Sequence, residues 1–341
     1  MRLALLLAFA LLLPACSRKS EPDKGVVLYS SIDAGVIKPI LDAYTKRTGV
    51  RVDLVADTET TKTTGLINRL VTEKNNPRAD VWWSGEVVGT AQLSRAGVLA
   101  PYNSLAADAA ARACSHPGWP VRGTRGDWFG LALRPRVIVY ATKAYPQPDS
   151  APRSLEALAG SKKPVAIANP AFGTTRGHLA ALYITLGRDD FTKLMSSVEW
   201  RVVDGNAAVV RAVANGECDL GITDYDDYQS GLANNWPLGS AFLSLTADPA
   251  GPVVATPGTI ALIRGAPHPD LAKAFIDEML SIATEQTLAA GEWSSMPVLK
   301  GVATPGDRFK GLTPAEVDWE KAADFLDEAA AAWAESQKPE R

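Results

Sequence analysis

Basic residues are too few in this sequence to form the kind of surface that nucleic acid binding requires. Lys and Arg together number 35 against 38 Asp and Glu, so the formal net charge is −3. A chain that binds phosphate backbones normally carries a clear excess of positive charge on one face. We therefore exclude nucleic acid as a partner.

Histidine is scarcer still, with three residues in 341. His116 and His268 stand beside prolines in expected loops, and His178 falls just inside an expected helix. Common zinc sites draw several of their ligands from His and Cys. Three scattered histidines argue against a His-rich zinc site.

Short catalytic and nucleotide-binding motifs are also lacking. The sequence contains no G-x-S-x-G, no H-E-x-x-H and no G-x-x-x-x-G-K-[ST] phosphate loop. An exported hydrolase that uses paired carboxylates stays open as a remote alternative. We expect a protein that is not an enzyme.

Only the first segment could meet a membrane. Leu3–Leu13 is a run of 11 apolar residues, too short to cross a hydrocarbon layer of roughly 30 Å as a helix. It fits a signal peptide over residues 1–15. Leu13-Pro14-Ala15-Cys16 resembles a bacterial lipobox, which implies a lipid on Cys16 and a tether over residues 16–24. We expect an exported protein, periplasmic or at the cell surface and anchored by lipid; a plain signal peptide is the alternative.

What the sequence does contain is an alternation of strand and helix patterns. The chain, with 341 residues, is longer than the roughly 250–300 residues at which one hydrophobic core stops growing. A break rich in Gly, Pro and Arg over 116–135 separates two series of expected strands. These strands are Val26–Ser30, Val50–Leu54, Ala79–Trp83, Val165–Ala168, Trp200–Val203 and Asp219–Thr223. The pattern predicts an α/β protein with two units, each a mostly parallel sheet covered on both faces. Near the end, Thr313-Pro314-Ala315-Glu316 resembles a capping box and predicts a last helix from Pro314.

Polar loops follow five of these strands. They are residues 30–33, 84–86, 169–176, 204–206 and 224–228. Open α/β sheets bind ligands at the carboxyl ends of their strands. Any one loop is explained equally well by helix N-capping, since Ser, Thr, Asp and Asn are preferred there. Five such loops around one expected cleft favour a binding site.

Two kinds of charge would meet in that cleft. The segment Gly173-Thr174-Thr175-Arg176 opens a helix with free backbone N–H groups and two hydroxyls, which predicts an anion site. Asp33, Glu86, Asp226 and Asp227 bring carboxylates. If these carboxylates converge, their pKa values must rise or they must bind a cation, either a metal or an amine.

Several segments together resemble the substrate-binding proteins of bacterial ABC importers, within the ferric-ion-binding family. They are VVLYSSIDAGVIKPILDAYTKRTGVRV, ADVWWSGEVVGTAQLSRAGVLAPY, RPRVIVYAT, ANPAFGTTRGH, DGNAAVVRAVANGECDLGITDYDDY and TPGTIALIRGAPHPDLAKAFIDEML. The resemblance implies a type II periplasmic-binding-protein fold, in which two lobes joined by crossing strands close on ligand like a flytrap. It also implies an ABC permease as partner and a monomeric receptor.

The same resemblance gives the expected lobes. Lobe one is expected to comprise 25–134 and 255–305, and lobe two 135–254 and 306–341, with hinge strands near Val137–Tyr140 and Thr259–Ile263. Cys114 and Cys218 then lie in different lobes, where a disulfide would need Cα atoms within about 7 Å. We expect two free thiols.

The resemblance is weaker at the metal ligands. The family usually holds ferric iron with a His, a Glu and two adjacent Tyr. Here Asp33 falls at the His position, and Gly85, followed by Glu86, falls at the Glu position. Asp226-Asp227 replaces the tyrosine pair, with Tyr225 and Tyr228 on either side. Gly173, Thr174, Thr175 and Asn206 sit at positions that resemble the family's anion site, beside Arg176.

Two ligand hypotheses follow from these residues. The first is a metal ion carried with a co-bound anion, such as ferric iron with phosphate or carbonate, and with no tightly bound cofactor. Its ligands would be Asp33, Glu86, Tyr225, Asp226 and Asp227. The alternative is a phosphorylated or zwitterionic organic solute: a phosphonate, a sugar phosphate or a polyamine-like molecule. Tyr29, Trp82 and Trp83 could then contact its organic body.

Overall fold

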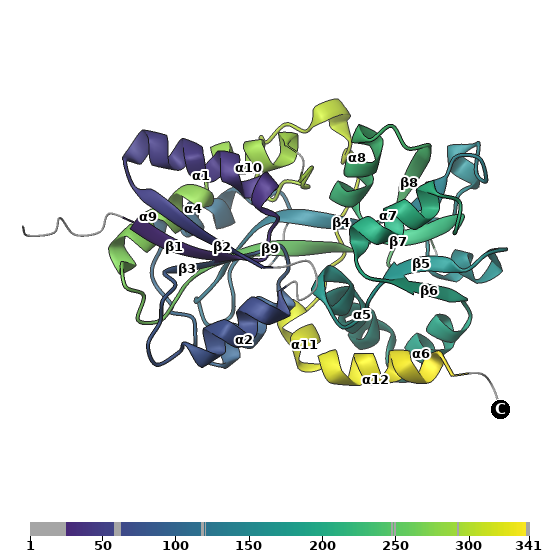
Figure 1. The fold of residues 1–341 in the computed structure, drawn as a ribbon, viewed down its shortest axis with the longest axis horizontal. Helices are drawn as coiled ribbons and strands as arrows, with labels where there is room; N and C mark the ends of the chain where they lie inside the picture. Colours follow the sequence, from purple (N-terminus) through teal and green to yellow (C-terminus); the bar gives the residue numbers. More distant parts are fainter. Residues whose placement is uncertain are drawn as a thin grey trace, which may run out of the picture.

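One long strand, β4 (Phe129–Ala141), runs through both halves of the molecule and changes partners on the way (Figure 1). Phe129–Pro135 pairs antiparallel with β9 (Ala255–Leu262), and the part from Arg136 onward pairs antiparallel with β7 (Leu220–Asp224) and β8 (Leu238–Phe242). This computed structural model describes residues 25–57, 63–116, 119, 121–246, 248, 250–291 and 293–338.

Lobe one is built on the strand order β2-β1-β3-β9-β4. Strand β1 is parallel to β2 and β3, and β9 is antiparallel to β3 and β4. Besides β4 and β9, its elements are β1 (Gly25–Ser30), α1 (Ala34–Thr48), β2 (Arg51–Ala56), α2 (Thr64–Thr72), β3 (Val81–Ser84), α3 (Val88–Arg95), α4 (Leu105–Ala113), α9 (Pro269–Met279) and α10 (Ile282–Ala290).

Helix α1 shows how local sequence produces this lobe. Ile37, Ile40, Leu41 and Tyr44 recur at helical spacing and are the buried face of the helix. The helix ends at Gly49, whose φ of 72° is left-handed and whose N–H bonds to the carbonyl of Thr45. Such amphipathic helices cover the apolar strands, so β1 and β3 are buried on both faces.

Lobe two continues the sheet in the order β4-β7-β5-β6. Strand β5 is parallel to β6 and β7. Its further elements are β5 (Val165–Ala168), α5 (Gly173–Leu186), α6 (Arg188–Ser196), β6 (Trp200–Val203), α7 (Asn206–Ala214) and α8 (Tyr225–Ala233). The expected α/β architecture with two units is confirmed, and all six expected strands are present within two residues of their predicted bounds.

The change of partners in β4 locates the crossing between the lobes. The pair Pro135–Ala255 closes the ladder with β9, and the next residue, Arg136, pairs with Asp224 of β7. The crossing therefore precedes the expected hinge strand Val137–Tyr140, which lies inside lobe two. Similarly, Thr259–Leu262 pairs with β3 inside lobe one.

The C-terminal helices contact both lobes. Helix α11 (Trp319–Asp324) packs against α3 and α5, and α12 (Leu326–Ser336) packs against α5 and α6 (Figure 1). Trp319 belongs to the lobe-one core, and Trp333 packs in lobe two. Residues 319–336 thus bridge the lobes, where we expected them in lobe two alone. The other lobe boundaries stay a prediction. The last helix pair also starts at Trp319, after Asp318 as N-cap, and not at Pro314.

Both cysteines in the described part of the chain are free, as expected: Cys114 is half-buried in lobe one and Cys218 is buried in lobe two. None of the helices in that part is both long and apolar enough to cross a membrane. Residues 1–24, which include the expected signal peptide, Cys16 and the tether, lie outside the described residues.

Candidate functional site

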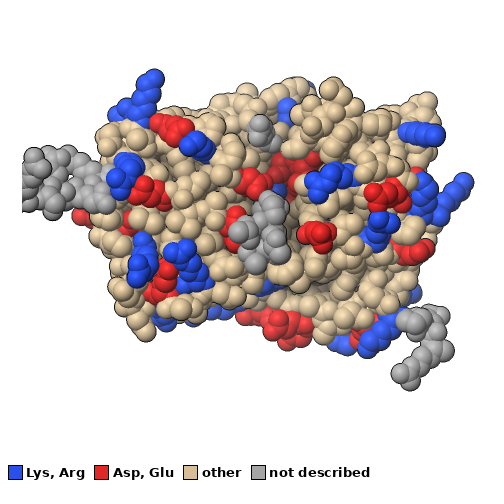
Figure 2. Space-filling model, viewed as in Figure 1, with Lys and Arg blue, Asp and Glu red and all other residues tan. Residues whose placement is uncertain are grey.

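A pocket opens between the two lobes at the carboxyl ends of the strands, with a cavity of about 60 Å³. Acidic side chains gather at the middle of the face where the lobes meet (Figure 2). The pocket is lined by Ser31, Thr63, Gly85, Glu86 and Arg134 from lobe one, and by Ala168, Asn169, Phe172, Gly173, Thr174, Thr175, Asp204, Gly205, Asn206, Ala207 and Asp227 from lobe two. All five polar loops expected there therefore contribute at least one residue to its lining.

Two helix N-termini point into this pocket. Helix α5 begins at Gly173 and α7 at Asn206, and neither N-cap residue, Phe172 or Gly205, makes a side-chain capping bond. The first N–H groups of each helix are therefore free to donate to a ligand, and both helix dipoles place partial positive charge there. Gly173 has a φ of 56°, the left-handed region that favours glycine. This half of the pocket suits an anion.

Beneath these helix ends lies a buried polar network centred on Asp224. Its Oδ2 accepts hydrogen bonds from Thr174 Oγ1 at 2.6 Å and Asn206 Nδ2 at 2.8 Å. Its Oδ1 accepts one from Arg136 Nη1 at 2.7 Å. Burial alone would raise the pKa of Asp224, but the guanidinium groups of Arg134 and Arg136 outweigh it and hold that pKa below its usual range. Asp224 is therefore an anion at neutral pH.

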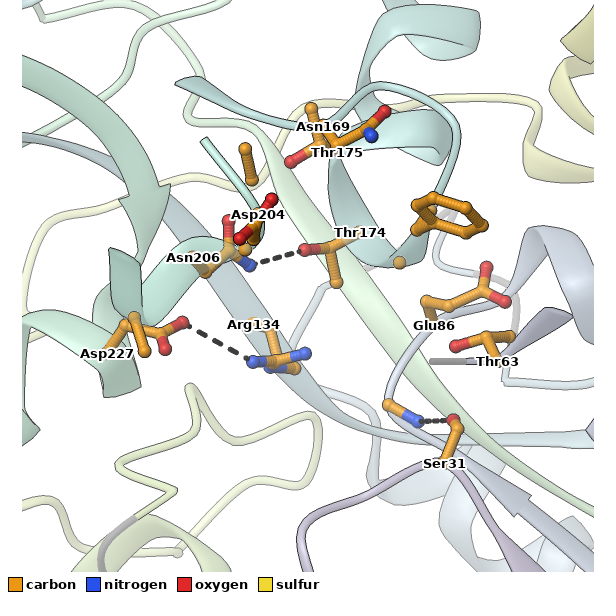
Figure 3. Close-up of a pocket in the computed structure, with 16 residues that line it drawn as sticks. Ser31, Thr63, Glu86, Arg134, Asn169, Thr174, Thr175, Asp204, Asn206 and Asp227 are labelled. Carbon is orange, nitrogen blue, oxygen red and sulfur yellow. Dashed lines mark hydrogen bonds and ion pairs between the residues drawn. The ribbon is translucent and has the colours of Figure 1, made fainter. Parts of the chain in front are cut away.

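The network changes the expected role of two anion-site side chains. The Thr174 hydroxyl donates to Asp224 and accepts from Asn206 Nδ2 at 3.0 Å (Figure 3), so this residue offers its backbone N–H to a ligand. Arg176 lies outside the pocket lining; its Nη2 donates to Gln92 Oε1 of α3 at 2.7 Å and so links lobe two to lobe one. The other expected anion-site residues lie together at the pocket: Gly173, Thr174, Thr175 and Asn206. Arg176 instead forms a hydrogen bond between the lobes.

Three carboxylates from the end of β7 and the start of α8 surround the guanidinium group of Arg134. Arg134 Nη2 lies 2.7 Å from Asp226 Oδ2, 3.2 Å from Asp224 Oδ2 and 3.9 Å from Asp227 Oδ2. Burial opposes the charge of Arg134, but these carboxylates raise its pKa further above the ordinary arginine value. Figure 3 shows Arg134 between Asp227 and the lobe-one side of the pocket. Donor oxygens of the three aspartates lie within 4.8 Å of one another, close enough to share one metal ion.

Glu86 is buried on the lobe-one side. Both of its carboxylate oxygens accept from the N–H of Gly89, at 3.0 and 3.1 Å, so it stabilises the start of α3 while lining the pocket. Burial raises its pKa, against the opposing effects of Arg176, the α3 backbone N–H groups and Arg134. Its carboxyl group can offer a hard oxygen donor to a cation in the pocket.

Two expected ligands lie elsewhere. Asp33 is exposed at the start of α1 and does not line the pocket. Tyr225 is buried in an aromatic cluster, with ring centroids 5.2 Å from Phe242 and 5.4 Å from Phe309. Asp226 reaches the site through Arg134 and is not itself part of the pocket lining.

The expected contacts of an organic ligand with Tyr29, Trp82 and Trp83 are wrong. All three side chains are buried in the lobe-one core, and the Trp82 indole N–H donates to Thr90 Oγ1 at 2.8 Å. The helices on both faces of the sheet leave neither tryptophan facing the cleft. Phe172 is the aromatic side chain that lines the pocket.

Sequence reasoning missed Arg134 and Arg136 as site residues. Both stand in the segment RPRVIVYAT, which we used only for the family resemblance and for the expected hinge strand Val137–Tyr140. The available signal was two arginines inside an otherwise apolar strand, because a buried charge requires a partner. Nothing in the local sequence identifies Asp226 and Asp224 as the partners of these arginines, because they lie some 90 residues further along the chain.

The chain is similar in sequence to proteins that are named as ferric iron-binding proteins. The chain is 28% identical over 222 residues to the Fe(3+)-binding periplasmic protein of Serratia marcescens, covering 64% of this chain and 62% of that protein. It is 24% identical over 288 residues to the major ferric iron-binding protein of Neisseria meningitidis serogroup B, covering 83% of each.

Solved structures share the fold. Iron-bound HitA from Pseudomonas aeruginosa superposes with a TM-score of 0.76 at 22% identity, covering 92% of this chain and 99% of that one. The periplasmic binding protein AfuA from Actinobacillus pleuropneumoniae, with fructose-6-phosphate bound, gives 0.74 at 19% identity, covering 92% and 98%. The expected periplasmic-binding-protein fold is thereby confirmed.

A family model covers most of the chain. The model for bacterial extracellular solute-binding proteins matches residues 26–291, which include most of both lobes and every residue that lines the pocket. This agrees with the expectation of a binding protein and not an enzyme. The chain belongs to the family of bacterial extracellular solute-binding proteins.

Proposed function

We propose that this protein is the periplasmic receptor of an ABC importer and that it captures a ferric ion together with a small anion in the cleft between its lobes. The observation that carries the proposal is the meeting of two chemistries in one pocket. Glu86 and Asp227 bring hard oxygen donors, and the N-termini of α5 and α7 bring anion-binding N–H groups. Names of relatives that bind ferric iron support the choice of metal.

The size of the cavity supports a small ligand. About 60 Å³ has room for an ion with a phosphate- or carbonate-sized anion, and a larger organic solute would require the lobes to separate further. The ferric ion is cargo here, and we propose no tightly bound cofactor. The partner would be the permease of the importer, with the receptor acting as a monomer.

The export and anchoring of the protein complete the proposal. Cys16 would carry a lipid after removal of residues 1–15, leaving residues 16–24 as the tether to the membrane. Wild type should then incorporate a labelled fatty acid, and the Cys16→Ser variant should not. Equal labelling of the two proteins would contradict the lipid anchor.

Calorimetric titration of dialysed, chelator-treated protein tests the ligand. Ferric ion delivered from nitrilotriacetate should bind with an affinity that depends on added phosphate or carbonate. Asp226→Asn should weaken binding by about thirtyfold to several-thousandfold, since removing one partner of a buried charged set costs roughly 2–5 kcal/mol. The control Asp248→Asn changes an exposed residue and should leave affinity unchanged. Wild-type affinity in Asp226→Asn would overturn this placement of the metal.

One observation favours a second candidate, a phosphorylated organic solute. Arg134 already supplies a cation to Asp226 and Asp227, so the cleft can be electrostatically satisfied there without a metal. The anion-binding helix ends would then take the phosphate of the solute, and Phe172 would contact its organic part. Such a solute should bind without metal and compete with phosphate, which the same titration distinguishes.

A further inference from the structure

The guanidinium group of Arg134 occupies the centre of the aspartate cluster. Its Nη2 is within 4 Å of a carboxylate oxygen from each of Asp224, Asp226 and Asp227. Those three residues are also the set whose donor atoms converge closely enough to hold one ion. Among the residues that the structure describes, the protein therefore carries a tethered cation at the group of acidic side chains that could share a metal ion.

Arg134 is held in this position from both lobes. Its backbone lies on β4, where Arg134 pairs with Thr256 of β9, while the three aspartates belong to β7 and α8 of lobe two. The guanidinium also lies 5.9 Å from the ring centroid of Trp293. A side chain on Gly85 would place its Cβ 3.3 Å from Nη1, so glycine at this position leaves room for the group.

A metal ion and the Arg134 guanidinium would compete for the same carboxylate oxygens of Asp224, Asp226 and Asp227. Oxygen ligands lie about 2.0–2.2 Å from small hard cations. In this structure Asp226 Oδ2 instead accepts from Arg134 Nη2 at 2.7 Å. Two positive charges a few ångströms apart in a buried site repel strongly, because little solvent screens them. A metal can therefore use the cluster only if Arg134 moves away.

We infer that Arg134 is a specificity-determining residue, an internal cation that an incoming metal must displace from Asp226 and Asp227. This inference rests on the proposed capture of a ferric ion with an anion. The displaced guanidinium would remain at the pocket that Arg134 lines, beside the N-termini of α5 and α7. A co-bound phosphate there gives it a new partner. Metal binding is then favourable only when the anion is present, which makes the anion a condition of metal capture.

Titration of variants with ferric nitrilotriacetate, with and without inorganic phosphate, tests the displacement. Arg134→Gln removes the competing cation and should bind ferric ion at least about tenfold more tightly than wild type in the absence of phosphate. Adding phosphate should then increase its affinity little further. The coupling energy of close charge pairs is more than enough for a tenfold change in affinity. Arg134→Lys keeps the charge and should stay dependent on phosphate. The control Arg201→Gln removes an exposed arginine paired with Glu217 and should behave as wild type.

The outcomes separate the two proposals. If wild type binds ferric ion and Arg134→Gln binds it no more tightly, the displacement is overturned while the function stands. If neither protein binds ferric ion under any condition, the proposed function fails and the displacement fails with it.

A measurement on wild-type protein covers the case in which Arg134→Gln does not fold. The Nε–Hε signal of Arg134 in a ¹⁵N-labelled sample, assigned by its loss in Arg134→Lys, reports where the guanidinium lies. Adding gallium(III), a diamagnetic substitute for ferric ion, together with phosphate should shift that signal strongly, and phosphate alone should shift it less. An unchanged signal at saturating gallium would overturn the displacement.

Discussion

Arg136 and Asp224 form a fully buried ion pair, 2.7 Å between Nη1 and Oδ1, at the point where β4 leaves lobe one and enters lobe two. The two residues are also directly opposite each other in the β4–β7 ladder. The same aspartate accepts hydrogen bonds from Thr174 and Asn206, at the start of the two helices that face the pocket. One ion pair thus fixes the crossing strand and the anion-binding helix ends together.

Breaking this pair should strongly destabilise the protein. Asp224→Asn keeps the shape of the side chain but leaves Arg136 buried without its counter-charge, and such a loss typically costs about 3–5 kcal/mol. Urea denaturation should show this loss in the free energy of unfolding. The control Asp219→Asn breaks the partly exposed pair with Lys163, at 2.8 Å, and should cost less than about 1 kcal/mol. Equal losses in the two variants would contradict the importance we give to the buried pair.

Glu285 should make stability fall as pH rises. Its carboxylate accepts the N–H groups of Ala132, Val298 and Leu299, and burial raises its pKa against those bonds. A folded-state pKa above the unfolded value of about 4.3 means that the folded protein binds more protons in that interval. This contribution is fully present below the unfolded pKa and is lost as pH rises through the folded pKa.

The difference between wild type and Glu285→Gln isolates this effect. The free energy of unfolding of wild type, measured by urea denaturation from pH 4 to pH 7, should fall more with rising pH than that of Glu285→Gln. Asp224 contributes with the opposite sign, because its pKa is lowered and its stabilisation is lost only on acidification. Parallel pH profiles for the two proteins would rule out the assignment to Glu285.

The position of the pocket could be predicted from the sequence because it depends on local patterns. Apolar runs marked the strands, and the polar residues after each strand marked one edge of the sheet, which is where Glu86, Gly173 and Asn206 meet. The direction of single side chains depends on the geometry of each turn, which the sequence pattern does not give. Asp33 therefore fell at an exposed helix start although its neighbour Ser31 lines the pocket.

Interactions between distant segments were beyond the same reasoning. Arg136 finds Asp224 through the register of β4 against β7, across 88 residues of chain. Pro314, expected to open a helix, instead forms a bridge with Val253 that keeps it extended. The missed ion pair and the wrong helix start have the same cause: both depend on pairing between distant segments, which the local sequence signal does not contain.

Gly173 should be needed for anion binding in a way that a comparable glycine is not. Gly173→Ala places a side chain on a residue with a φ of 56°, which strains the backbone at the start of α5 by roughly 1–3 kcal/mol. Gly216→Ala introduces similar strain at a φ of 75°, and in both cases the added Cβ meets open space. Phosphate titration should show weaker binding in Gly173→Ala alone, while thermal unfolding should show similar destabilisation of both variants. Equal phosphate affinity in the two variants would contradict an anion site at α5.

Gln92 should contribute to closure of the lobes without touching the ligand. It accepts a hydrogen bond from Arg176 Nη2 at 2.7 Å, between α3 of lobe one and α5 of lobe two, and it does not line the pocket. Gln92→Ala removes this link and should leave the closed form less populated. Since apparent affinity scales with the population of the binding-competent form, ligand binding should weaken by about two- to tenfold.

Small-angle scattering separates this effect from damage to the site. Wild type should become more compact on adding ferric ion with phosphate. Gln92→Ala should have a larger radius of gyration before ligand is added and reach the wild-type radius at saturation, because the ligand contacts are intact. The control Gln229→Ala, on α8, should match wild type throughout. A radius that does not change on saturation of wild type would count against lobe closure itself, whereas identical affinities of wild type and Gln92→Ala would count only against the Arg176–Gln92 link.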